Sequence, residues 1–450
     1  MIKKISLAVL AAALSTSAFA AGNVSTEAQS SADSIQTQID ALKQEIAALQ
    51  NKTAKVEAVH ANEAQITVPT NQGSIQNFLF SDVRDGVTPI GMLSSSQFAL
   101  GILKQRNMFS DHSLVFGGYL EADAQAWNGS KIQTTTQVDA NDPSKGYEYY
   151  STSGRNIYLT TATLYSVANM GRYVTAELDL SGDQDNTPDV QDAMVIFGNL
   201  SDYPVFVTVG KNRPSVGSFA GGGPWTGSLT QMLFRPDHIT NASVNFAADG
   251  LNTSLAVFGT DDQTTDFSYG AFYGHQVGNW SYGINGGYMY DVNGSGNSSF
   301  NDATQASTGD KRIGAVNFDG SLNYDIYGVG AGWAQSTNKD NLTNNGYAGA
   351  WYISAGMSPV IYGRSTNFSI SYNGAYNTDN LPVTLSGSAI NGYETNDATV
   401  SGSGVDKMVI ASVQRPIFSD NVLLGLEYAY MHMYNSQHTN AYTADLSVYF

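Results

Sequence analysis

Residues 280–290 read Trp-Ser-Tyr-Gly-Ile-Asn-Gly-Gly-Tyr-Met-Tyr, with apolar and aromatic side chains on every second position. Successive side chains of a β-strand point to opposite faces. One face therefore has aromatic residues at both ends and smaller residues between them: Trp280, Tyr282, Ile284, Gly286, Tyr288 and Tyr290. Ten residues at ~3.3 Å each, tilted by ~40°, cover roughly 25 Å, the height of an outer-membrane apolar band between two aromatic girdles.

The same alternation recurs along most of the chain and predicts an all-β transmembrane protein, a 16-stranded antiparallel outer-membrane β-barrel. The last strand ends the chain on Phe450, which resembles the C-terminal signal that outer-membrane proteins present to the barrel-assembly machinery. We place the strands at residues 113–127, 156–168, 172–182, 189–199, 203–211, 241–249, 251–259, 267–276, 279–292, 313–324, 327–337, 346–356, 366–376, 405–415, 420–434 and 441–450.

The connections between these strands alternate between shorter and longer ones. Short connections such as Asp249-Gly250 and Asp325-Ile326 form one set, and most of the longest connections, including 128–155 and 377–404, belong to the other. Transmembrane barrels show this asymmetry, with short periplasmic turns and long external loops. An even number of strands places both ends of the barrel on the periplasmic side.

The composition excludes several other classes of protein. Of 450 residues, 42% are hydrophobic and 13% are charged, which argues against disorder, and the absence of cysteine excludes a disulfide framework. No run of about 18 apolar residues is present, which argues against a helical membrane protein. A large soluble β protein such as a propeller or a lectin is the alternative, but we find no blade repeat.

The first 20 residues predict a secretory signal peptide (1–20). Lys3 and Lys4 precede an apolar run, and Ala18-Phe19-Ala20 forms a small-x-small cleavage site. Removal of this segment leaves 19 basic residues against 39 acidic ones, a net charge of −20. Such a chain is unsuited to a nucleic-acid partner. The protein is therefore expected in the bacterial outer membrane.

The next segment, residues 21–60, predicts a periplasmic coiled coil. Its apolar residues recur at alternating spacings of four and three, at Ile35, Ile39, Leu42, Ile46 and Leu49. This seam favours a homo-oligomer, although a lone amphipathic helix would also fit, and the mixture of Ile and Leu does not distinguish a dimer from a trimer. Residues 61–111 form either a docked linker or a partial plug, and residues 112–450 form the barrel.

The third external loop, residues 212–240, here called L3, is the candidate constriction. It is rich in glycine, and with the end of the preceding strand it concentrates Lys211, Arg213, Trp225 and Arg235. Arg can bind carboxylate or phosphate through two parallel hydrogen bonds. These four residues are the predicted substrate-binding residues of the pore. The alternative is that the basic residues lie at the rim and pair with acids or with lipopolysaccharide.

Four carboxylates are predicted to line the pore opposite this loop. Glu121 and Asp123 lie on the first strand, and Glu177 and Asp179 lie on the third, each at an inward position. They would create a field across the pore together with the basic loop, or they would be buried against the segment 61–111.

No metal site, cofactor or catalytic residue is predicted. The turn from Asp183 to Asp189 is rich in carboxylates that could hold Ca²⁺, but its spacing is not that of an EF-hand and a solvated acidic loop is favoured. The histidines show no paired metal spacing. Glycine-flanked serines such as the one in Gly402-Ser-Gly404 lack the context of a nucleophile elbow, so the protein is not expected to be an enzyme.

The overall plan, together with Val115-Phe-Gly-Gly-Tyr-Leu-Glu121 and Val209-Gly-Lys-Asn-Arg-Pro214, resembles the LbtU-type siderophore porins of Legionella and the related Francisella outer-membrane iron-uptake proteins. The resemblance covers nearly the whole chain and implies TonB-independent uptake of a ferric siderophore. The stretch from Lys211 to Pro214 also resembles phosphate-selective porins, which are trimers with a coiled coil and a basic eyelet. This chain departs from them in its scarcity of lysine.

The function expected from these observations is passive passage of a small solute. Sixteen strands are enough for an aqueous lumen, whereas a TonB-dependent receptor needs about 22 strands and a plug domain. A ferric siderophore is the first candidate solute, and the alternative is a general nutrient or anion porin. A structural or adhesive surface barrel with a blocked lumen is the alternative of another class.

Overall fold

The computed structural model describes residues 89–137, 147–150, 152–184, 188–259, 265–297, 299–300, 312–339, 343, 345–381, 390–394 and 404–450. The chain divides into two units, Met1–Asn62 and Glu63–Phe450, and all described residues belong to the second. The predicted signal peptide and coiled coil therefore lie outside the described residues, as do residues 185–187 of the predicted acidic turn.

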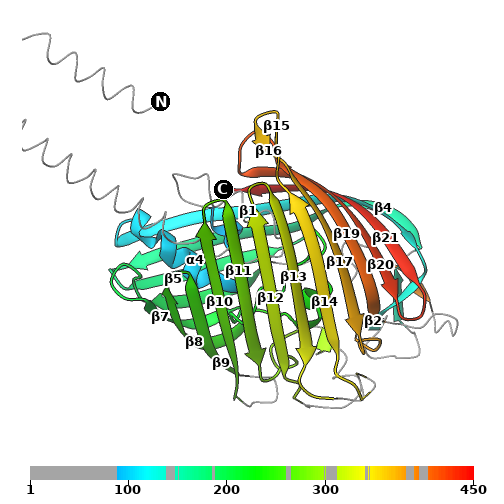
Figure 1. The fold of residues 1–450 in the computed structure, drawn as a ribbon, viewed down its shortest axis with the longest axis horizontal. Helices are drawn as coiled ribbons and strands as arrows, with labels where there is room; N and C mark the ends of the chain where they lie inside the picture. Colours follow the sequence, from blue (N-terminus) through cyan, green and yellow to red (C-terminus); the bar gives the residue numbers. More distant parts are fainter. Residues whose placement is uncertain are drawn as a thin grey trace, which may run out of the picture. The chain divides into compact units, whose positions relative to one another are not determined.

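Sixteen antiparallel strands of the described chain close into one barrel (Figure 1). Each strand is paired with its neighbours in sequence order, and β21 pairs with β1 to complete the ring. The strands are β1 (His112–Gly129), β4 (Ser153–Met170), β5 (Val174–Gly182), β6 (Asp189–Phe197), β7 (Val205–Asn212), β8 (Ile239–Ala248), β9 (Leu251–Gly259), β10 (Thr265–Val277), β11 (Trp280–Met289), β12 (Ala315–Tyr324), β13 (Tyr327–Ser336), β14 (Gly349–Met357), β17 (Asn367–Tyr376), β19 (Val405–Pro416), β20 (Val422–Met433) and β21 (His438–Tyr449).

The predicted fold class is confirmed, and every predicted strand overlaps an observed one. On β11 the predicted outer face is exposed at Trp280, Tyr282 and Ile284, whereas Asn285 and Met289 on the other face are buried. Aromatic rings pack across strands near one end of this face, where Trp280 and Tyr324 have centroids 4.5 Å apart. The alternation therefore separates an apolar outer surface from the lumen, as a membrane-spanning barrel requires.

The connections at one end of the barrel are tight. Between β8 and β9, Asp249 and Gly250 both have positive φ, 49° and 79°, which is the geometry of a two-residue hairpin whose twist matches that of the strands. A longer connection contains a short hairpin of β15 (Val360–Ile361) and β16 (Arg364–Ser365). At the other end, β2 (Ile132–Gln137), β3 (Tyr147–Tyr150) and β18 (Ile390–Glu394) form a small sheet that joins two long loops.

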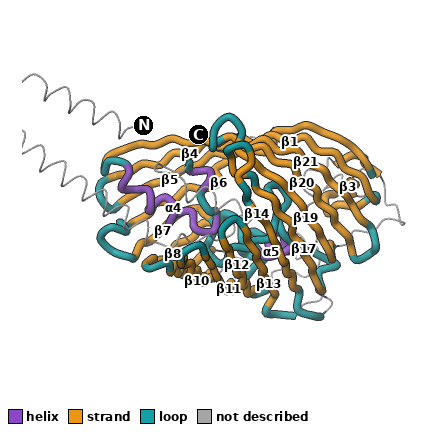
Figure 2. The backbone as a smooth tube through the Cα atoms, turned by 45° about the horizontal axis from the view of Figure 1, so that its top comes forward, coloured by secondary structure: helices purple, strands orange, loops and turns teal. Residues whose placement is uncertain are grey.

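Two helical segments were not predicted from the sequence. The first runs through η1 (Ile90–Met92), η2 (Ser95–Gln97), α4 (Phe98–Gln105) and η3 (Arg106–Met108), directly before β1. The second is α5 (Leu229–Phe234), within L3. Among the described residues, no helix is long and apolar enough to cross a membrane. Figure 2 shows α4 and α5 in purple, surrounded by the strands.

Candidate functional site: L3 and the inner wall

L3 leaves β7 at Asn212 and follows the inner face of the barrel wall. Its first residues lie directly on the backbone of β10 and β11, where the inward positions are glycines. A Cβ added at Gly270 would overlap the carbonyl oxygen of Ser215, and one at Gly287 would overlap that of Val216. The two glycines therefore provide the space along which L3 enters the lumen.

Polar side chains of successive strands then hold the L3 backbone. Asn285 of β11 accepts a hydrogen bond from the Ser218 amide at 3.1 Å, and the Ser371 hydroxyl of β17 donates to the Gly221 carbonyl. Asn373, also on β17, accepts from the amide of Leu229 at 3.3 Å. Because buried backbone groups must be paired, these side chains fix the path of L3 from β11 to β17.

The tip of L3 is bound to β20 by one carboxylate. Glu427 accepts from the Trp225 amide at 2.9 Å and from the Thr226 amide at 3.0 and 3.2 Å. A Cβ at Gly223 would overlap this carboxylate, so glycine is needed for the close approach. The Trp225 ring meets Tyr158 of β4 edge-on, with centroids 5.9 Å apart. Thus the tip contacts strands on both sides of the β1–β21 junction.

The returning part of L3 forms an apolar cluster with the inner wall. Ser228 caps α5 by accepting from the Gln231 amide at 3.2 Å. The buried helix residues Leu229, Leu233 and Phe234 pack with inward apolar residues such as Met289, Ala350, Met408 and Met431. This apolar cluster covers the inner face of the wall from β11 to β20.

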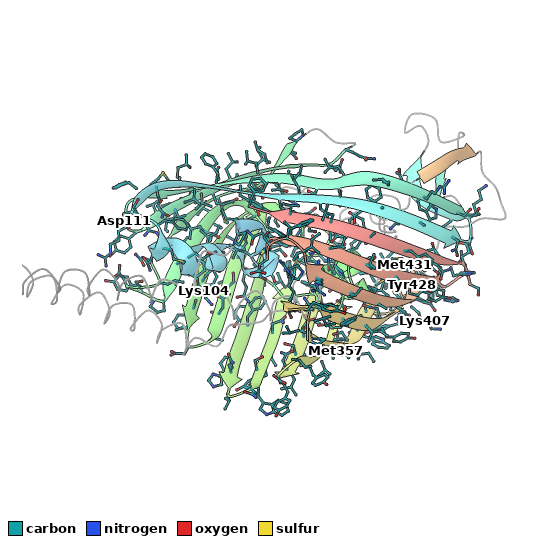
Figure 3. All side chains as sticks on the ribbon, turned by 90° about the horizontal axis from the view of Figure 1, so that it is seen from above. Lys104, Asp111, Met357, Lys407, Tyr428 and Met431 are labelled. Carbon is teal, nitrogen blue, oxygen red and sulfur yellow. The ribbon has the colours of Figure 1, made fainter. Side chains whose placement is uncertain are left out.

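The segment before β1 occupies the inside of another part of the wall. Leu100 and Leu103 of α4 pack against the inward side chains Met194, Ile196 and Phe206. Only a cavity of about 20 Å³ remains between α4 and β7–β9, roughly the space of one water. The described part of the predicted linker or plug, residues 89–111, therefore lines the lumen; Lys104 and Asp111 mark it in Figure 3.

The base of L3 concentrates the charged groups. Arg213 lies 3.6 Å from Asp237, and His238 Nδ1 lies 2.6 Å from Asp192 Oδ1 on β6. The Lys211 ammonium donates to the Val190 carbonyl at 2.6 Å. We call Lys211, Arg213, Arg235, His238, Asp192 and Asp237 the L3-base cluster.

Burial changes the proton affinities within the L3-base cluster. It lowers the pKa of Arg235 well below its usual range, with repulsion from Arg213 acting in the same direction and Asp237 opposing it. Burial likewise lowers the pKa of Arg213 and, with Arg213 nearby, that of His238 to about 2. His238 is therefore neutral at neutral pH, and the cationic character of the cluster rests on the lysine and the arginines.

The predicted site residues fall at two ends of L3. Lys211, Arg213 and Arg235 come together at its base, as the clustering in the sequence suggested. Trp225 lies instead at the tip, held by Glu427.

The four predicted pore-lining carboxylates are all inward and nearly fully buried, but they form two groups. Asp179 accepts from the Asp192 amide at 2.6 Å, so the β5 carboxylates face the L3-base cluster. Glu177 next to it has no hydrogen-bond partner for either oxygen within the described structure. Glu121 and Asp123 lie apart from these, beside Asp445 of β21.

Sequence reasoning missed Asp192, His238, Glu427 and Asp445. Glu427 and Asp445 occupy inward positions between outward apolar residues on β20 and β21, so the strand alternation contained their signal. Their partners could not be found in this way, because those lie on distant parts of the chain.

The fold and this inward loop define a porin-type outer-membrane β-barrel. The chain is similar to Pseudomonas putida OprB in its high-pH structure, with a TM-score of 0.50 and 9% identity over 78% of this chain and 97% of that one. The chain belongs to the family described as "Protein of unknown function (DUF3573)", whose model matches residues 20–316. No curated protein matches the chain.

Two further solved structures are similar at lower scores. They are the outer-membrane channel DcaP of Acinetobacter baumannii (TM-score 0.47, 10% identity, 75% of this chain and 97% of that one) and a loop-deletion mutant of the Vibrio cholerae outer-membrane protein OmpT (0.46, 11%, 76% and 100%). At these identities the likeness concerns the fold alone. None of these matches names a siderophore porin, so the resemblance to the LbtU-type family stays a prediction.

Proposed function

We propose that the protein is an outer-membrane channel through which small solutes diffuse past a charged constriction. The observation that carries the proposal is the position of L3, which is fixed along the inner wall by Asn285, Asn373 and Glu427. It brings the bases Arg213 and Arg235 to the side of the lumen that carries the β5 and β6 carboxylates. Charged groups of both signs at a narrow passage set selectivity by their field.

The finer proposal is that the solute is a ferric siderophore of the polycarboxylate type. Guanidinium groups bind carboxylates with two hydrogen bonds, and the L3-base cluster holds two arginines beside a lysine. The Arg213 guanidinium lies 3.6 Å from the carboxylate of Asp237. The carboxylate of an incoming solute could approach the guanidinium more closely than this. The resemblance to siderophore porins supports the same class of solute.

The phosphate or general anion porin is the second candidate, since the same bases could bind phosphate. The carboxylates Glu177, Asp179 and Asp192 beside them weaken the positive field on which a simple anion would depend. Basic and acidic side chains thus lie side by side at the base of L3. This arrangement favours a large ferric chelate, which can present carboxylates to the arginines, over a small anion. We further propose that lipid and lipopolysaccharide surround the outer face and that the coiled coil 21–60 drives assembly into a homo-oligomer such as a trimer.

The test is single-channel recording in planar bilayers with the full-length mature chain. We expect stable channels that are blocked by ferric citrate-type chelates at lower concentration than by phosphate. Block by phosphate alone would favour the anion porin. Absence of any stable channel would overturn the transport proposal in favour of a structural or adhesive barrel. Uptake of labelled iron by a deletion strain tests the siderophore directly.

A further inference from the structure

Three carboxylates meet at the junction between the first and last strands of the barrel. Glu121 and Asp123 project inward from β1, and Asp445 projects inward from β21. Each can offer one oxygen such that all three oxygens lie within 4.8 Å of one another. We call Glu121, Asp123 and Asp445 the seam carboxylates.

The register of the strands makes this arrangement costly without a counter-charge. Asp123 stands directly opposite Asp445, a position at which like charges destabilise a strand pair. Both residues are almost fully buried, at 1% and 3% exposure. Within the described chain, no ion pair joins any of the seam carboxylates to a lysine, arginine or histidine. Buried anions need a compensating charge.

Two oxygens at the same place lack a donor. Thr160 donates to Asp123 Oδ2, but Asp123 Oδ1 is buried without a partner in the described structure. Gln414 of β19 is 4% exposed, and its Oε1 is also without a partner. The Gln414 amide nitrogen hydrogen-bonds to Asp445, so the amide lies at the carboxylates, and its unpaired oxygen is a ligand type that hard cations accept.

Cross-strand pairing aims this amide at the seam. The register runs from Gln414 to Gly425 to Asp445 to Asp123, so the four positions form one row across β19, β20, β21 and β1. Gly425 has no side chain, and a Cβ built there would contact Asp445 at 3.2 Å and Gln414 at 3.7 Å. The two side chains therefore approach each other over the glycine.

We propose that the seam carboxylates, with the amide oxygen of Gln414, bind a calcium ion that joins the first strand of the barrel to the last. Ca²⁺ takes oxygen ligands at 2.3–2.6 Å, so oxygens within about 5 Å of one another can share one ion. The oxygen-only donor set favours Ca²⁺ or Mg²⁺ over transition metals, and the mixed, irregular set favours the larger ion.

The test is Ca²⁺ binding by the full-length protein in detergent after removal of divalent ions with a chelator. We expect one Ca²⁺ per chain in equilibrium dialysis and a rise of about 5 °C in the unfolding temperature at excess Ca²⁺. Asp445→Asn and Glu121→Gln should lose both effects. The control is Glu177→Gln, which removes a buried inward carboxylate from another part of the wall and should keep them.

The same variants distinguish a cation bound by the seam carboxylates from protons shared among them. In chelator, Asp445→Asn should be at least as stable as the unaltered chain, because it removes the like charge opposite Asp123. An unaltered chain with no stoichiometric Ca²⁺ binding and no change in unfolding temperature overturns the proposal. So does an Asp445→Asn variant that retains the full response to Ca²⁺. Either result leaves the conductance test of the channel unaffected.

Discussion

The two ends of L3 are held in different ways. At the tip, uncharged amides of Trp225 and Thr226 point at one carboxylate, Glu427, in a buried site. At the base, the Arg213 guanidinium lies beside Asp237, and the neutral ring of His238 contacts Asp192. Backbone amides that donate to a buried carboxylate fix the position of the chain, whereas the charged side chains at the base contribute an electric field. The tip therefore positions L3, and under the proposed function the base sets which solutes pass it.

The largest effect on L3 is expected from removal of the carboxylate at its tip. Glu427→Ala deletes three hydrogen bonds and leaves two buried amides unpaired, each at a cost of about 1–3 kcal/mol. We expect L3 to leave the wall and the single-channel conductance to rise about twofold or more, because L3 narrows the lumen. Bilayer recording measures this.

The matched control for the tip is Asp325→Asn, which changes one carboxylate in a tight turn with φ of 53° and is remote from L3. Asn tolerates this conformation. Conductance in the control should equal that of the unaltered chain. An unchanged conductance in Glu427→Ala would mean that the apolar packing of α5 alone holds the loop.

A second change tests the path of L3 rather than its tip. In Gly287→Ala, the new methyl group overlaps the Val216 carbonyl, so L3 must shift at a cost of about 1–3 kcal/mol. Gly286→Ala is the control, since its Cβ faces outward with its nearest neighbour, Phe318, at 3.4 Å. Limited proteolysis should cut L3 faster in Gly287→Ala only. Equal cleavage of both variants would contradict the inferred path.

The barrel could be predicted from the sequence, but its interior could not. Strand alternation depends on residues two apart, so it was sufficient to separate the outer face of β11 from its inner face. The position of L3 depends instead on Gly270, Gly287 and Glu427, which lie far from the loop in sequence and act only because the closed barrel brings them to it. No local pattern contains that information.

The predicted site residues show the same difference between what nearby residues reveal and what only the closed barrel determines. Lys211, Arg213 and Arg235 could be grouped from the sequence because they lie near the two ends of L3, which two neighbouring strands, β7 and β8, bring together. Trp225 was grouped with them by the same nearness in sequence, yet the extended first half of L3 carries it to the far end, against Tyr158.

The third prediction concerns the charges at the base. Arg213→Ala and Arg235→Ala should lower the anion-to-cation permeability ratio by a factor of about two to five, equivalent to ~0.4–1 kcal/mol for a partly screened charge. Reversal potentials in a salt gradient measure the ratio. The effect should shrink at high salt, and Arg172→Ala, which removes a basic residue exposed at the turn before β5, should not show it. A salt-independent or absent shift would place the bases outside the solute path.

The smallest expected effect is the response of His238 to pH. Burial lowers its pKa to about 2, so the folded protein leaves this ring neutral where the unfolded chain, with a pKa near 6.5, takes up a proton. The folded state therefore loses stability as pH falls below about 6.5, by up to ~1.4 kcal/mol per pH unit from this group. His238→Gln should flatten the free energy of unfolding between pH 6 and pH 4. Because the ring gains no charge in the folded channel, His238→Gln should have the same ion selectivity as the unaltered chain at every pH in this interval. A selectivity that shifts toward anions on acidification in the unaltered chain, but not in His238→Gln, would show that the ring is protonated at the base of L3, in contradiction to its lowered pKa.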